Sequence, residues 1–169
     1  MVLTKSELLD SLKKETHILV HLASKVDRST ADYRPTPKQR STLELLRYLT
    51  IMGPELVKAA KAGGFDVNSW TIASKAAEAL DFDQTVVALQ AQADEYVRLL
   101  GDMSDADFRA EMTGFDGSPV AKGAFIVNLV LSGHAAYRTQ LFCYLKSSGR
   151  DDLNTMNLWQ GVDAPMATV

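Results

Sequence analysis

Residues 119–148 read PVAKGAFIVNLVLSGHAAYRTQLFCYLKSS, and this stretch decides the fold. His134 and Arg138 stand in the middle of an otherwise apolar strip of the helix that it predicts. At 100° per residue, the strip consists of Val127, Leu131, His134, Arg138, Leu141 and Leu145. A charged side chain is almost never fully buried without a partner. The strip therefore predicts either a polar pocket or a paired charge.

Three more segments have the periodicity of amphipathic helices and recognisable ends: residues 4–26, 41–62 and 83–100. The first two begin with a capping box, in which a Thr or Ser and a Glu three residues later satisfy each other's free backbone N–H groups. Alternating strand patterns are weak throughout. Four amphipathic helices of similar length predict an all-α protein built as a four-helix bundle.

The segments between these helices are less well defined. Residues 65–80 are ambiguous, and we expect one short helix at 74–80. Residues 113–118 contain two glycines and an Asp-Gly pair, which predict a turn or a short hairpin. Pro119 predicts the first turn of the fourth long helix, because proline favours that position.

The composition is that of one ordinary globular domain, with 169 residues, 46% of them hydrophobic and 23% charged. We expect a bundle over residues 1–150 and a tail over residues 151–169, whose Trp159 packs back on the bundle or on a second copy.

A net charge of -3 gives no reason to expect a nucleic-acid partner. No apolar run is long enough to predict a membrane span. A lone cysteine, Cys143, fits a reducing compartment, so we expect a cytoplasmic protein.

Several stretches in order along the chain match the pattern of a known family: Tyr33-Arg34-Pro35-x-Pro37, residues 41–47, residues 103–108, His134-x-x-x-Arg138, Gln140-Leu141 and Tyr144-Leu145-Lys146. They resemble the DinB/YfiT-like superfamily, and the fourth helix resembles the last helix of that superfamily. Together they cover about residues 3–150. The resemblance implies a four-helix bundle with up-down-down-up connectivity.

The resemblance also implies a metal site of three histidines, one from the second helix and two from the fourth. Such a set leaves positions open for water or a thiol and suits Zn²⁺ or Ni²⁺. The corresponding residues here are Tyr48, His134 and Arg138, so one ligand of three is retained. Arginine has no free lone pair, and its charge would repel a divalent cation. We therefore expect no metal and no other cofactor.

Arg138 needs a carboxylate partner. Glu15 is the leading candidate, because it lies within the apolar stripe of the first helix. Glu44 and Glu55 of the second helix are the alternatives. If Arg138 is buried and paired with Glu15, removing either side chain should strongly destabilise the fold, because the other charge would be left buried and unpaired.

His134 has three interpretations. A single buried imidazole most often bonds to a backbone carbonyl or to a hydroxyl, such as that of Tyr48 or Tyr137. The alternatives are contact with a bound small molecule and ligation of a metal ion.

The fourth helix is apolar over most of its circumference. Outside the strip it carries Phe125, Ile126, Leu129, Val130 and Phe142. A helix this apolar is either central or covered by a partner, so we expect a homodimer.

These observations predict a metal-free polar pocket lined by Tyr48, His134, Arg138 and Glu15. A guanidinium beside a tyrosine and an imidazole favours a small anionic ligand, such as a carboxylate or a phosphate. We assign no catalytic residue and expect a binding module rather than an enzyme.

Two alternatives stay open. One is a metal-dependent thiol (S-)transferase, with His134 as a zinc or nickel ligand and Tyr48 as an unusual second one. The other is a purely structural bundle or dimer whose inner polar residues form an ion-pair network, with no cavity between the first, second and fourth helices.

Overall fold

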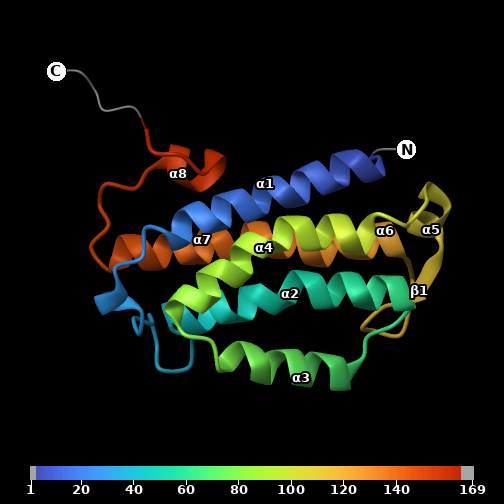
Figure 1. Cartoon of the computed structure of the whole chain (residues 1–169), viewed down its shortest axis with the longest axis horizontal. Helices are drawn as coiled ribbons and strands as arrows, with labels where there is room; N and C mark the ends of the chain where they lie inside the picture. Colours follow the sequence, from blue (N-terminus) through green and yellow to red (C-terminus); the bar gives the residue numbers. More distant parts are fainter. Residues whose placement is uncertain (1–2, 165–169) are drawn as a thin grey trace.

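Four long helical rods form the bundle in the computed structural model, which describes residues 3–164 (Figure 1). Two rods on one diagonal, α1 and α2, each pack against both rods of the other diagonal, α4 and α7. The helices are α1 (Lys5–Ala23), α2 (Thr42–Ala62), α4 (Phe82–Leu100) and a composite of α6 (Lys122–Phe125), the π-helical segment η2 (Ile126–Leu131) and α7 (Ser132–Ser147). The predicted all-α bundle is confirmed.

The connectivity is also the predicted up-down-down-up one. In Figure 1, α1 and α7 run in one direction, whereas α2 and α4 both run in the other. Two parallel neighbours need a return path, and the helix α3 (Val67–Glu78) provides it by packing along the outer side of α2. None of the helices within residues 3–164 is both long and apolar enough to cross a membrane.

The helix starts follow the local capping chemistry. Both predicted capping boxes are present, at Thr4 and at Ser41. The third long helix begins slightly earlier than predicted, because Asp81 rather than Asp83 caps it and forms a box with Gln84. The remaining short turns are η1 (Arg28–Thr30) and α5 (Asp105–Arg109).

The prediction of a short helix at residues 74–80 is wrong in its bounds. The helix α3 starts at Val67, where Asp66 accepts hydrogen bonds from the backbone N–H groups of Asn68 and Ser69. This helix packs mainly on α2, so most of its surface stays in solvent and its apolar stripe is narrow. Ile72 accordingly stays exposed.

The prediction that Pro119 opens the fourth helix is also wrong. Residues 119–121 form the strand β2 (Pro119–Ala121), which pairs antiparallel with β1 (Glu111–Thr113). The predicted turn between them is the tip of this hairpin, closed by a 2.8 Å hydrogen bond from the Gly114 N–H to the Ser118 carbonyl. Pro119 lacks an N–H and is tolerated because it opens an edge strand. The helix begins only at Lys122.

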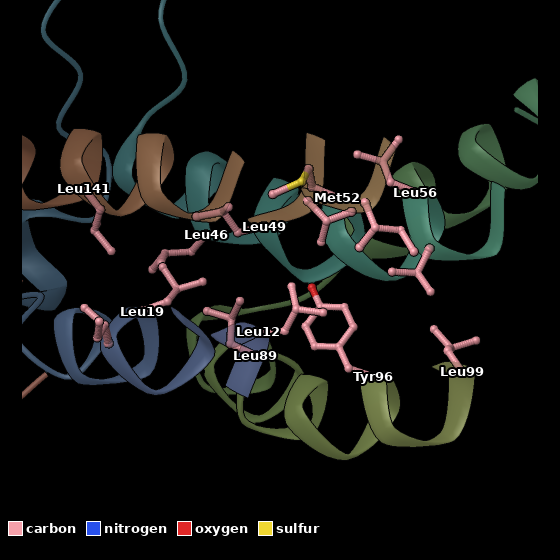
Figure 2. Packing of buried hydrophobic residues seen from close by; sticks show 14 of the residues in the cluster. Leu12, Leu19, Leu46, Leu49, Met52, Leu56, Leu89, Tyr96, Leu99 and Leu141 are labelled. Carbon is pink, nitrogen blue, oxygen red and sulfur yellow. The ribbon is translucent and has the colours of Figure 1, made fainter. Parts of the chain in front are cut away.

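Leucines from all four rods fill the bundle centre, together with Tyr96 of α4, whose hydroxyl points towards α2 (Figure 2). Phe125, Ile126 and Val130 are buried in this same core. The apolar circumference of the fourth helix is therefore largely covered within one chain. The homodimer inferred from that circumference stays a prediction.

The described part of the predicted tail folds back across α1 and α7 (Figure 1). It contains the helix α8 (Thr155–Gln160), with Leu153 and Asn157 buried against the bundle. An ion pair of 2.6 Å between Lys25 and Asp163 holds its end. Residues 1–2 of the predicted bundle and residues 165–169 of the predicted tail lie outside the described residues.

Candidate aromatic ligand site

Arg138 and Glu15 form the predicted ion pair. Nε of Arg138 lies 2.7 Å from Oε2 of Glu15, and the two side chains are 7% and 14% exposed. The N–H is not aligned on the oxygen, so the contact is a close charge pair without a well-formed hydrogen bond. Burial raises the pKa of Glu15, and the charge of Arg138 opposes that rise.

Two groups of the tail complete the surroundings of Arg138. Its guanidinium donates to the backbone carbonyl of Leu158, and the ring of Trp159 lies 5.0 Å from its Cζ. The two alternative partners are engaged elsewhere. Glu44 closes the capping box of α2, and Glu55 accepts from Lys58 and Ser69.

His134 shares a 2.6 Å hydrogen bond with the hydroxyl of Tyr96. Both residues are buried, His134 to 1% exposure. A hydroxyl partner was predicted and is present, but it belongs to Tyr96 and not to Tyr48 or Tyr137, which corrects the predicted partner. Tyr96 lies on α4, diagonally across the bundle from α7. Gly53 of α2 leaves room for the contact, since a Cβ there would lie 3.0 Å from Nε2 of His134 and would overlap the Tyr96 hydroxyl oxygen.

Burial lowers the pKa of His134 from 6.5 to about 4. The folded protein therefore keeps this imidazole neutral at pH values at which the unfolded chain binds a proton. The resulting stability is fully present above pH 6.5 and is lost as the pH falls towards 4.

We expect this group alone to lower the free energy of unfolding by about 2 kcal/mol between roughly pH 7 and roughly pH 5. Denaturant unfolding of the wild type and of His134→Gln at both pH values measures the effect. Other titrating groups contribute to both proteins alike, so the wild type should show the steeper loss. The same pH dependence in both proteins would contradict a buried neutral His134.

A separate candidate ligand site lies between α2, α3, the η2–α7 junction and the tip of the hairpin. It is a cavity of about 520 Å³. We call it the aromatic cavity, because its walls include five aromatic rings: those of Tyr48, Phe65, Trp70, Phe115 and Tyr137. Met52 and Leu56 of α2 add apolar surface.

The electrostatic character of the aromatic cavity is neutral. None of the described residues that line it is acidic, basic or a histidine. Burial and the neighbouring Tyr137 raise the pKa of Tyr48, so this tyrosine stays protonated. Arg40 lies outside the lining, with its guanidinium carbon 4.0 Å from the centre of the Tyr48 ring. Asn128 and Ser132 provide polar groups at the η2–α7 side.

The π-helical segment η2 forms part of this wall and was not predicted. Asn128 and Leu129 of η2 line the cavity, and the Ser132 hydroxyl donates to the carbonyl of Val127, five residues earlier. One extra residue per turn changes which side chains face outward, and such turns occur often at functional sites.

Comparison with known proteins agrees with this architecture. No family model matches the chain, and no curated protein matches it either. Among solved structures, it is similar to the crystal structure of a DinB-like protein, YjoA, from Bacillus subtilis. The TM-score is 0.68, and the match covers 90% of this chain and 97% of that one. The chain has the DinB-like fold. At 16% sequence identity, this likeness shows the fold alone.

The metal positions that the DinB-like resemblance implied do not suit a metal here. Arg138 is engaged by Glu15 and by the tail, and a guanidinium offers no lone pair. Nε2 of His134 is engaged by Tyr96. Within residues 3–164, no group of three or more His, Cys, Asp or Glu side chains could hold a metal ion. The donor set does not fit zinc or nickel.

The four residues predicted to line one polar pocket are divided in this DinB-like bundle. Tyr48 lines the aromatic cavity on the α3 side, whereas Glu15 and Arg138 line a different cavity on the α1 side. His134 faces the core between them. The physical reason is the pairing of charges, because Glu15 holds the guanidinium on the α1 face of α7, away from α2.

Proposed function

We propose that this protein is a metal-free binding module that holds a small, uncharged organic molecule in the aromatic cavity. The observation that carries the proposal is the combination of size and chemistry. About 520 Å³ lies within the range of ligand sites, and an apolar wall with a few polar groups is their usual composition. Asn128 and Ser132 would orient the ligand by hydrogen bonds.

The neutral lining favours an uncharged ligand. A charged molecule that entered the cavity would lose hydration without meeting an opposite charge among the described lining residues. The small anionic ligand expected from the sequence has less support, because Glu15 already neutralises the charge of Arg138 that would bind it. Arg138 meets Glu15, the Leu158 carbonyl and the Trp159 ring.

The buried polar residues serve the fold in this proposal. Nε2 of His134 and the Tyr96 hydroxyl share a hydrogen bond across the bundle, and Glu15 and Arg138 join α1 to α7. Such contacts favour this set of neighbouring helices, because an arrangement that separated Glu15 from Arg138 would leave a buried charge without its counter-charge.

Binding can be tested by thermal unfolding with four probes: benzyl alcohol, cyclohexylmethanol, acetate and inorganic phosphate. A ligand present at about 100 times its dissociation constant stabilises the folded state by about 2.7 kcal/mol. We expect stabilisation by at least one of the two uncharged probes. Ala136→Trp, which places an indole on the lining, should abolish it.

The matched control is Thr139→Trp, an exposed position of α7 that does not line the aromatic cavity. It should leave the stabilisation unchanged. Stabilisation by acetate or phosphate alone would overturn the proposal in favour of an anionic ligand. An absence of stabilisation by all four probes would overturn the aromatic cavity as a binding site.

A further inference from the structure

The five rings of the aromatic cavity form an unbroken series of tilted contacts. Adjacent ring centres lie 5.1–6.1 Å apart, and their planes are inclined by 50–67°. The order is Tyr137, Tyr48, Trp70, Phe65 and Phe115. From this arrangement we infer that the bound molecule is itself a flat, uncharged aromatic one, an inference that rests on the proposed function.

Ring electrostatics provide the first argument. An aromatic face is electron-rich and its edge is electron-poor, so rings prefer edge-to-face or offset contacts. In a series of tilted rings, some present an edge and others a face to the space beside them. A flat aromatic ligand can extend the series at both kinds of contact. A saturated ring has no such quadrupole and gains only from burial.

The available volume is consistent with a ligand of this kind. A closed cavity of roughly 150 Å³ is enough to hold one benzene molecule. The aromatic cavity, at about 520 Å³, has room for two fused rings and a polar substituent. Asn128 and Ser132 lie where that substituent could form a hydrogen bond.

A cationic ligand is the main competitor, since ammonium groups also bind over aromatic faces. The position of Arg40 argues against it. Its guanidinium carbon lies 4.0 Å from the centre of the Tyr48 ring and already makes that contact. A second cation in the cavity would be repelled by Arg40 and would find no acidic side chain among the described lining residues.

The experiment compares 2-naphthol with decahydro-2-naphthol by calorimetric titration of the full-length protein. The two probes share a carbon skeleton and a hydroxyl group, and the saturated one is the more hydrophobic. Burial alone would therefore favour the saturated probe. Ring–ring contacts alone provide about 2- to 10-fold, and we expect them to outweigh the difference in burial, so that 2-naphthol binds more tightly than the saturated probe.

Trp70→Leu removes a central ring of the series and keeps an apolar side chain. It should bring the affinity ratio of the two probes close to one. Trp159→Leu is the same substitution at a ring outside the aromatic cavity and should leave the ratio unchanged. Phe115 lies at the hairpin tip and is 60% exposed, so Phe115→Leu repeats the test if Trp70→Leu does not fold.

The outcomes separate this inference from the proposed function. Equal binding of both probes would overturn the aromatic preference and leave the cavity as a binding site. Binding of neither probe would overturn both. A preference for 2-naphthol that persists in Trp70→Leu and in Phe115→Leu would show that the series of rings is not its cause. Tighter binding of tetramethylammonium than of 2-naphthol would overturn the inference that the ligand is uncharged.

Discussion

Replacing Glu15 with alanine is expected to lower the free energy of unfolding by about 3–5 kcal/mol. The variant leaves Arg138, which is only 7% exposed, without its counter-charge. Most of the loss is the cost of a buried, unpaired guanidinium rather than the strength of the pair itself. Denaturant unfolding of the wild type and of Glu15→Ala measures it.

Two controls sharpen this test. Arg98→Ala removes an exposed ion pair with Glu95 and should cost less than about 1 kcal/mol. The double variant Glu15→Leu with Arg138→Met removes both charges and should recover most of the stability. If Glu15→Ala were as mild as Arg98→Ala, the pair would not be buried in solution.

Replacing Gly53 with alanine is the second change with a large expected effect, roughly 3 kcal/mol of destabilisation or more. The new Cβ would overlap the Tyr96 hydroxyl oxygen and lie 2.9 Å from the Tyr96 Cζ. Tyr96 is fully buried, so its ring cannot withdraw without opening the core or breaking its bond to His134. Alanine is the better helix former by about 1 kcal/mol, a gain too small to compensate.

The double variant Gly53→Ala with Tyr96→Phe tests the cause of this effect. Phenylalanine lacks the oxygen that the new Cβ would overlap, so the double variant should be more stable than the sum of the two single changes predicts. Gly64→Ala is the control glycine, because a Cβ there meets no atom within 4 Å. Strict additivity of the two changes would mean that Gly53 does not make room for the Tyr96–His134 contact.

Much of the fold follows from interactions between residues three or four apart. The capping boxes at Thr4 and Ser41 and the apolar stripes behind them were predicted and are confirmed, because both are set by neighbours along one helix. The errors in the predicted secondary structure occur where contact with a residue distant in sequence decides the local conformation. Local chemistry predicts Pro119 in the first turn of a helix, because proline favours that position, but its pairing with β1 places it in a strand.

The candidate site was predictable only in part. A charge on an apolar stripe demands an opposite charge on a facing stripe, which is why the pairing of Glu15 with Arg138 could be proposed from the sequence. The partner of His134 could not be identified with the same certainty. Tyr96 falls seven residues after Leu89 on an apolar stripe, and Gly53 interrupts a helix, but nothing local shows that the two meet.

The sequence by itself determined four long helices, the capping boxes that begin the first two, and the need to pair a buried arginine. Periodicity and capping act over short distances, and the cost of burying a charge applies wherever the chain folds. Only the tertiary structure decided that the rings of Tyr48, Phe65, Trp70, Phe115 and Tyr137 surround one cavity. These rings come from separate segments, and each of them resembles an ordinary core side chain in the sequence. A cavity exists only where packing leaves space between such segments, and no single segment carries that information.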